Sequence, residues 1–207
     1  VIVIGCDWAK QADYTALAVG CATCRTELER ARFNQIDYHF QAARLKALAA
    51  HWQAESVLTE LNSIGQPIFE MLQREGLPVV GFTTTASTKP PLIENLALAL
   101  ERAEWRFQPD PLWTAELEAY ERTVSTATGR SSYSAPEGMH DDTVIARALM
   151  VWRGNLIGTS MRGHMLALRH LLGTHHNATA EPDAAKGMVK EIEWREDAPT
   201  GKLDLLV

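Results

Sequence analysis

The sequence predicts an α/β fold, in which a mixed five-stranded sheet carries helices on both of its faces. Residues 1–6 form a continuous and largely β-branched apolar run, which is typical of a strand buried on both faces. From residue 37 on, amphipathic helical segments alternate with short strand-like segments. The order of three strands, helix, strand, helix and strand fits one sheet between two layers of helices.

The strands follow from short apolar segments that are separated by turn residues. Residues 14–21 and 27–36 come after short polar turns, so they extend the first strand into three consecutive antiparallel strands. Residues 56–61 follow a helix, and this crossover allows a fourth strand to lie parallel to the first. Residues 77–83 form a fifth strand after a second helix.

The helices follow from apolar side chains that recur every three to four residues. Their expected ranges are residues 37–53, 67–76, 90–105, 111–122, 141–152 and, with a weaker pattern, 161–172. Pro67, Pro90 and Pro111 stand at helix starts. Proline is tolerated there because the first residues of a helix have no helix carbonyl to which a backbone N–H could donate. Residues 123–127 and 130–134 flank Thr128-Gly129, which predicts a β-hairpin added before the last helix of the domain.

Length and composition favour one compact domain, because 46% of the 207 residues are hydrophobic. We expect this domain in residues 1–154 and a C-terminal helix with a loosely attached acidic tail in residues 155–207. The sequence has no apolar stretch near the roughly 20 residues that cross a bilayer, and its odd number of cysteines favours a reducing compartment. We therefore expect a soluble cytoplasmic protein and, since the chain begins inside a strand, a piece of a longer one.

Acidic residues stand at the ends of predicted strands and at the start of a predicted helix. Asp7 follows the first strand and Glu60 ends the fourth, so parallel pairing of these strands would place the two carboxylates side by side. A helix that starts at Asp141 or Asp142 could add a third carboxylate. Carboxylates gathered in this way repel one another unless cations neutralise them. The pattern predicts a site for two Mg²⁺ or Mn²⁺ ions, which favour oxygen ligands.

Each acidic residue also has a simpler explanation. Asp141 is a suitable helix N-cap, and Asp142 in a first turn would favour the helix dipole. Glu60 could point into solvent, and Asp13 could belong to a turn. His140 could orient a neighbouring carboxylate or have no role in its loop, so Asp13 and His140 are the weaker candidates for the site.

The net charge of −6 is unusual for an enzyme that binds nucleic acid. Phosphate binding normally requires a basic surface. Carboxylates that hold metals contribute part of this charge, and bound cations would reverse its sign locally. The charge therefore does not exclude a nucleic-acid substrate.

Four motifs occur in order along residues 1–152. They are Ile4-Gly5-Cys6-Asp7-Trp8-Ala9, Glu60-Leu61-Asn62-Ser63-Ile64-Gly65, residues 83–89 and residues 133–142. In these motifs the chain resembles the nuclease domain of the large terminase subunit of tailed bacteriophages, within the ribonuclease H-like superfamily. The resemblance does not extend to residues 154–207. A Gly-x-x-x-x-Gly-Lys-Ser/Thr loop is absent from the sequence, so we expect a nuclease domain without its ATPase motor.

The resemblance implies a ribonuclease H-like fold and an endonuclease that cuts concatemeric double-stranded phage DNA during genome packaging. It implies that Asp7 bridges two metal ions, that Glu60 binds one and Asp142 the other, and that Asp141 is a further ligand. Contacts to DNA phosphates are expected from three basic residues, Lys89, Arg122 and Arg130.

The same resemblance implies partners that act with the full-length protein, namely an ATPase motor domain, the small terminase and the portal, in the host cytoplasm. Two other functions remain open at this point. The chain could be a different ribonuclease H-like nuclease, such as a resolvase or a transposase-like enzyme. It could also be a non-catalytic module for capsid assembly.

Overall fold

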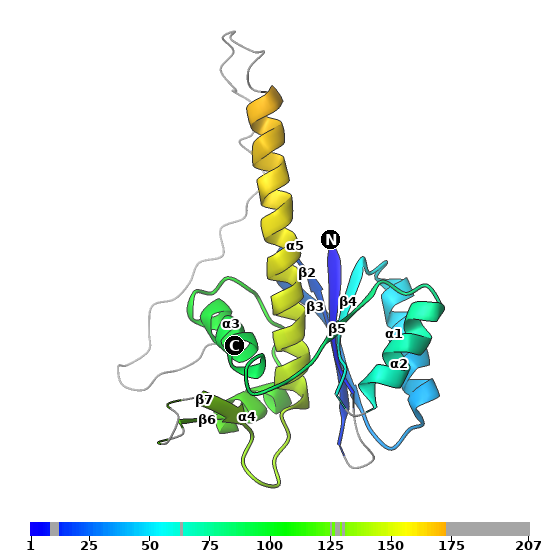
Figure 1. Cartoon of the computed structure of the whole chain (residues 1–207), viewed down its shortest axis with the longest axis vertical. Helices are drawn as coiled ribbons and strands as arrows, with labels where there is room; N and C mark the ends of the chain where they lie inside the picture. Colours follow the sequence, from blue (N-terminus) through cyan, green and yellow to red (C-terminus); the bar gives the residue numbers. More distant parts are fainter. Residues whose placement is uncertain (9–12, 63, 125, 127–128, 130, 173–207) are drawn as a thin grey trace. The chain divides into compact units, whose positions relative to one another are not determined.

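The computed structural model describes residues 1–8, 13–62, 64–124, 126, 129 and 131–172, with side chains as far as residue 158 (Figure 1). The strands are β1 (Ile2–Asp7), β2 (Thr15–Cys21), β3 (Thr26–Phe33), β4 (Ser56–Glu60), β5 (Val79–Phe82), β6 (Glu121–Val124) and β7 (Ser131–Ser134). The helices are α1 (Tyr38–His51), α2 (Gly65–Arg74), α3 (Lys89–Glu101), α4 (Pro111–Ala119) and α5 (Asp142–Leu172). The compact unit that contains the sheets comprises Val1–Met161.

Five strands form a mixed sheet in the order β3-β2-β1-β4-β5. β1 pairs antiparallel with β2, which pairs antiparallel with β3. On its other side β1 pairs parallel with β4, and β4 pairs parallel with β5. The structure therefore confirms the predicted fold class and places β1 at the centre of the sheet.

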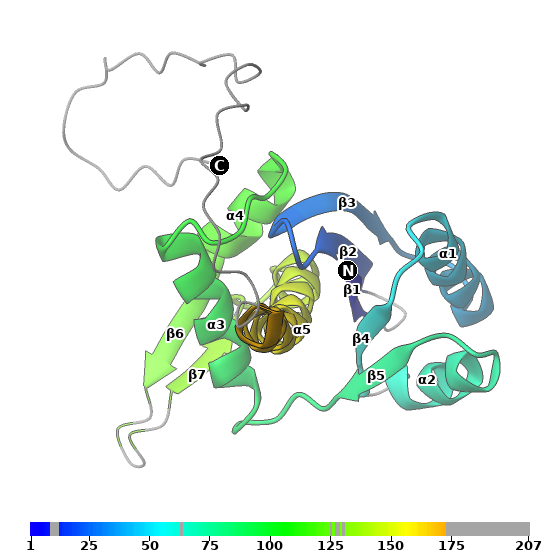
Figure 2. The same cartoon turned by 90° about the horizontal axis from the view of Figure 1, so that it is seen from above.

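Helices cover both faces of this sheet (Figure 2), with α1 and α2 on one face and α3, α4 and α5 on the other. Successive residues of β1 point to opposite faces, so Val3 belongs to the core under α5 and Ile4 to the core under α1 and α2. Both side chains are fully buried. This two-sided burial explains why the first strand is an unbroken apolar run.

Helix α5 packs directly on the backbone of β1 at Gly5. A Cβ atom added at Gly5 would collide with the carbonyl oxygen of Ala146 and would lie 2.5 Å from the backbone nitrogen of Met150. No larger residue fits between this strand and this helix without a shift of one of them. The close approach brings the first turn of α5 over the end of β1.

Local signals account for several helix boundaries. Asp37 and Asp110 precede α1 and α4, and their side chains accept hydrogen bonds from the backbone of His39 and Leu112. Gly76, which follows α2, has a φ of 80°, a conformation that glycine adopts at low cost. Such residues predict where a helix begins or ends even without tertiary information.

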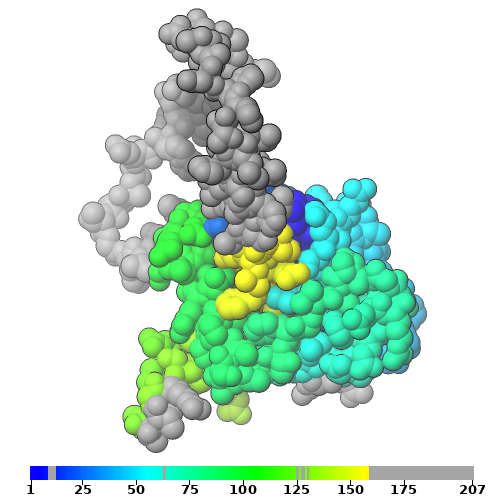
Figure 3. All heavy atoms as spheres, turned by 45° about the horizontal axis from the view of Figure 1, so that its top comes forward, coloured from blue at the N-terminus to red at the C-terminus, as the bar shows by residue number. Residues whose placement is uncertain are grey.

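The predicted helix over residues 111–122 is too long. α4 ends at Ala119, and Tyr120 has the extended angles φ −72° and ψ 122°. The next residues belong to β6, which pairs antiparallel with β7 from Glu121 opposite Ser134 to Val124 opposite Ser131. Cross-strand pairing thus overrides the helical preference of Glu121. The hairpin exists, but residues 125, 127–128 and 130 of its predicted loop and arms lie outside the described residues (grey in Figure 3).

Residues 141–152 and 161–172 were predicted as separate helices, but they belong to the single helix α5. Gly154 lies inside this helix, and an added Cβ atom there would be only 2.5 Å from the ring of Trp105, so a larger residue would not fit without a shift. The predicted tail lies outside the described residues from residue 173 on. Although α5 has 31 residues, none of the described helices combines the length and apolar character that a membrane span needs.

We predict that Gly5→Ala will lower the free energy of unfolding by about 1–3 kcal/mol, because the added methyl group forces α5 away from β1. Thermal unfolding followed by circular dichroism measures this change. Gly158→Ala is a matched control in the same helix, since the nearest atom to its Cβ would be 3.6 Å away. The control should be as stable as the wild type or slightly more stable. An unchanged melting temperature for Gly5→Ala would contradict the close packing.

Candidate active site

Strands β1 and β4 place Asp7 and Glu60 side by side at one edge of the sheet. Their parallel register pairs Cys6 with Thr59, and the next residue of each strand is acidic. Asp7 is only 8% exposed. Burial raises the pKa of Asp7 well above its usual value, and the neighbouring carboxyl of Glu60 raises it further. Two acids in this position favour a shared proton or a bound cation.

The backbone around Glu60 is held by residues of the same motif. A Cβ atom at Gly65 would collide with the carbonyl oxygen of Glu60, so α2 begins in direct contact with the end of β4. The side-chain amide of Asn62 donates to the Thr84 carbonyl at 2.8 Å, and its oxygen accepts from the Thr84 N–H at 3.0 Å. These contacts connect the loops after β4 and β5 and thereby fix the position of Glu60.

The start of α5 contributes Asp141 and Asp142. The Ile145 N–H donates to the Asp141 carbonyl at 2.9 Å, so the helix hydrogen bonds begin there. The Thr143 N–H donates to the carboxylate of Glu116 at 3.0 Å. A side chain of α4 thus satisfies this donor in the first turn.

Both acids of this turn lie near Asp7. Their charges contribute to the rise of the pKa of Asp7, after burial and Glu60. Asp7 therefore lies next to Glu60, and the charges of Asp141 and Asp142 at the start of α5 act on it.

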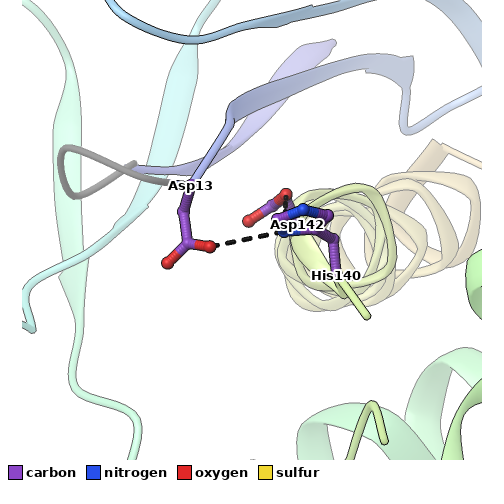
Figure 4. A group of neighbouring side chains, drawn as sticks. All are labelled: Asp13, His140 and Asp142. Carbon is purple, nitrogen blue, oxygen red and sulfur yellow. Dashed lines mark ion pairs between the residues drawn. The ribbon is translucent and has the colours of Figure 1, made fainter. Parts of the chain in front are cut away.

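Asp13 and His140, the weaker candidates, join Asp142 in a second group beside these acids (Figure 4). His140 Nδ1 lies 3.3 Å from Asp13 Oδ1 and 3.8 Å from Asp142 Oδ2. One potential ligand atom from each of the three residues lies within 4.8 Å of the other two, close enough to share one ion. The edge of the Tyr14 ring contacts the imidazole, with 5.2 Å between ring centroids.

Asp142 is buried among groups of both charges. Burial raises the pKa of Asp142 to about 6, while Arg32 and, more weakly, His140 lower it and Glu116 raises it. Arg32 Nη2 lies 3.3 Å from Asp142 Oδ2 and 3.1 Å from Glu116 Oε1. The carboxylate of Asp142 therefore belongs both to the acidic site and to the ion pairs of Arg32 with Asp142 and Glu116.

Lys89 lies on the acidic site, at the first position of α3. Its Nζ is 3.1 Å from Asp141 Oδ2 and 5.7 Å from the centroid of the Tyr120 ring. Burial and the negative charge of Asp141 raise the pKa of Tyr120, and Asp7 adds to this effect. Tyr120 therefore presents a neutral hydroxyl near the acids.

The predicted phosphate contacts are distributed over different parts of the protein. Lys89 lies beside the carboxylates, whereas Arg122 lies on the exposed strand β6 and donates to the Ser131 hydroxyl through Nε at 3.1 Å and Nη2 at 2.9 Å. Arg130 lies outside the described residues. Phosphate binding by these three residues stays a prediction.

The donor set suits divalent cations that prefer oxygen. The site offers several carboxylates and one imidazole. Burial first, and then the charges of neighbouring carboxylates, raise the pKa of Asp7, and a bound cation would offset both effects. Mg²⁺ and Mn²⁺ both accept carboxylate ligands, and Mn²⁺ accepts an imidazole more readily. The residues present therefore fit the predicted metal ions.

Three residues of the site were missed in the sequence. Arg32 is one of several charged residues on β3, Glu116 lies inside a predicted amphipathic helix, and Tyr120 lies in the segment wrongly assigned to that helix. The burial of Glu116, which is 5% exposed, becomes evident only when α4 is packed beside α5. Asp13, by contrast, could be found in the sequence as a weaker candidate, because it follows the motif that contains Asp7 by only a few residues.

Comparisons with known proteins connect this site to one family. The sequence profile described as "Terminase RNaseH-like domain" matches residues 4–151. The terminase large subunit of Thermus phage G20c is 32% identical over 155 residues, which cover 72% of this chain and 31% of that protein. The crystal structure of the large terminase nuclease from the same phage is 28% identical and covers 72% of this chain and 80% of that one, with a TM-score of 0.67. The G20c nuclease has also been solved with bound magnesium and with bound cobalt.

A second similarity concerns a different protein. The nitrate reductase alpha chain of Bacillus subtilis is 47% identical over 73 residues, which cover 35% of this chain but only 6% of that protein. Relatives from Mycobacterium tuberculosis match 61 residues at 46% identity. This chain therefore spans a small part of these curated relatives and about a third of the phage protein.

We predict that Asp7→Asn will raise the melting temperature of the metal-free protein at pH 7, because it removes a buried charge next to Glu60. The pKa of Asp7 is raised on folding, so its carboxyl favours the folded state at low pH and opposes it as the pH rises above about 4. A gain of about 1–3 kcal/mol should appear at pH 7 and fade towards pH 3 in calorimetric unfolding.

Asp110→Asn is the matched control, for which we expect a change in stability of the opposite sign. Burial alone would raise the pKa of Asp110, but Arg147 and Arg30 lower it below its usual value. This variant should lose stability at pH 7. Equal destabilisation by both substitutions would show that Asp7 is not under electrostatic strain.

Proposed function

Because this chain belongs to the family of terminase RNase H-like domains, we propose that it is a metal-dependent endonuclease that cuts double-stranded phage DNA during genome packaging. The group of Asp13, His140 and Asp142, close enough to share one ion, together with the buried pair of Asp7 and Glu60 at the ends of β1 and β4, carries this proposal. The related G20c nuclease with bound magnesium or cobalt supports the use of divalent ions.

The proposed roles follow from where each acid lies. Asp7 would ligate both ions, and Glu60 would ligate one of them. Asp142, with support from Asp13 and His140, would ligate the other. When bound, the two cations supply an activated water as nucleophile and stabilise the departing oxygen of the phosphodiester. The products are ends with a 5′-phosphate and a 3′-hydroxyl.

DNA binding requires positive charge near an acidic site. Lys89 is 3.1 Å from Asp141, and we propose that it also contacts a phosphate next to the scissile bond. Arg122, together with Arg130, holds the backbone farther away, along the β6–β7 hairpin. Contacts of this kind read no bases, so cleavage has little sequence specificity.

The proposal includes partners of a longer protein. The G20c large subunit is about three times as long as the part that matches this chain. In a large subunit of that length, an ATPase motor would move the DNA, and the small terminase and portal would position it in the host cytoplasm. The motor would decide when the nuclease reaches its substrate.

We also propose that the nuclease domain ends near residue 154. The family profile ends close to this point, at residue 151. The similarity to the nitrate reductase alpha chain covers only 6% of that protein, so it supports no proposal of nitrate reduction.

Asp7→Asn should reduce cleavage of plasmid DNA in Mn²⁺ by at least about 100-fold, because a ligand of both ions loses its charge. Agarose gels of supercoiled, nicked and linear plasmid measure the rate. Glu118→Gln, which changes an exposed carboxylate of α4, is the control and should cut like the wild type.

Equal nicking by Asp7→Asn and wild type would show that the activity arises elsewhere. Preference for a branched junction over a linear duplex would instead indicate a resolvase. Absence of any cleavage by the wild type in Mg²⁺ and Mn²⁺ would favour a non-catalytic module.

A protein truncated after Met161 should retain the cleavage rate and the melting temperature of the whole chain. This truncation keeps the compact unit and all buried residues of α5 that contact the sheet. Plasmid cleavage and calorimetry with both proteins measure the effect. A tenfold loss of activity with unchanged folding would show that residues after Met161 contribute to the nuclease.

A further inference from the structure

Arg32 approaches the candidate metal site from the edge strand β3. The sheet register aligns Arg32 with Ala16 and Ala16 with Asp7, so all three share one face of the sheet. From there the guanidinium reaches Asp142, with Nη2 3.3 Å from Oδ2. A permanent positive charge thus lies two strands away from Asp7 and in contact with another acid of the site.

Other contacts hold this guanidinium in place. Its Nη2 lies 3.1 Å from Glu116 Oε1, and its carbon atom lies 3.5 Å from the centroid of the Tyr14 ring. Glu116 itself is fixed, because its other oxygen accepts from both the N–H and the hydroxyl of Thr143. Arg32 would therefore remain beside Asp142 even if the Asp142 carboxylate gained another partner.

The oxygen that Arg32 contacts also faces the Asp13–His140–Asp142 group. His140 Nδ1 lies 3.8 Å from the same Asp142 Oδ2. A divalent ion held by this group would share that oxygen, or at least its carboxylate, with Arg32. Two cations in this position repel each other across a partly buried carboxylate.

We propose that Arg32 is a positioning residue that acts as an internal competitor of the metal ion at Asp142. It orients the carboxylate and neutralises it in the metal-free protein, and it weakens the affinity of the site for the divalent ion. This inference rests on the proposed metal site and assigns to Arg32 a role that the family comparison does not provide.

The test is the affinity of the metal-free protein for Mn²⁺ alone, measured without DNA by titration calorimetry and by the electron paramagnetic resonance signal of free Mn²⁺. Arg32→Gln should bind Mn²⁺ roughly tenfold more tightly than the wild type, because it removes the competing charge. Arg32→Lys keeps a positive charge but loses the planar guanidinium, so its affinity for Mn²⁺ should lie between those of the wild type and Arg32→Gln. A variant that is merely damaged would not bind the ion more tightly.

Arg25→Gln is the matched control, since it also removes one positive charge. Arg25 pairs with Glu104 at 2.5 Å and precedes β3, at the end of the strand away from Arg32. This control should bind Mn²⁺ like the wild type. In an Asp142→Asn background, Arg32→Gln should have no effect, because the shared carboxylate is gone.

Glu116→Gln tests the same inference in the opposite direction and does not depend on the folding of the Arg32 variant. This substitution removes the negative charge of Glu116, so Asp142 becomes the only carboxylate in contact with Arg32 among those described. Arg32 then competes more strongly with the ion, and the affinity for Mn²⁺ should fall several-fold. If the wild type binds Mn²⁺ and neither Arg32→Gln nor Glu116→Gln changes the affinity, Arg32 does not compete. If the wild type binds no Mn²⁺, the proposed function fails and the inference fails with it.

Discussion

The contact between α5 and β1 at Gly5 determines where the acidic side chains meet. Helix α5 begins at Asp142, four residues before Ala146, whose carbonyl lies against Gly5. A helix rises by about 1.5 Å per residue, so the first turn lies over the end of the strand, where Asp7 is found. A larger residue in place of Gly5 would move this turn away from Asp7. The position of one glycine thus couples the packing of the core to the geometry of the site.

Two buried clusters of charged residues in this protein differ in whether positive charges neutralise the negative ones. Arg147, which is 1% exposed, lies 2.9 Å from Glu27 and 2.9 Å from Asp110, and its guanidinium stacks 4.4 Å from the Trp113 ring. In that cluster each acid has a cation beside it. Asp7, by contrast, has Glu60 as its nearest charged neighbour. A balanced cluster can be purely structural, whereas buried acids without a cation oppose folding and indicate a site for a ligand.

The sequence was sufficient for the features that depend on local pattern and chain order. Three strands followed by a crossover helix allow β4 to lie parallel to β1, and the structure confirms this pairing, which places Asp7 beside Glu60. Arg32 and Glu116 could not be predicted, because their contacts depend on how far α4 and β3 lie from the start of α5. The contact of Trp105 with Gly154 inside α5 could not be predicted either, because it also depends on tertiary packing.

Helix α5 continues without interruption past residue 151, where the family profile ends. Continuity of a helix depends on local propensity and backbone hydrogen bonds, which carry no information about common origin. Tertiary contacts are more informative. Val151 is fully buried in the core under α5, and Ile157 still packs against that core, so the helix contributes to the nuclease for about two turns beyond the family match. Residues 152–157 therefore have a structural role in the nuclease domain, although the family profile ends before them.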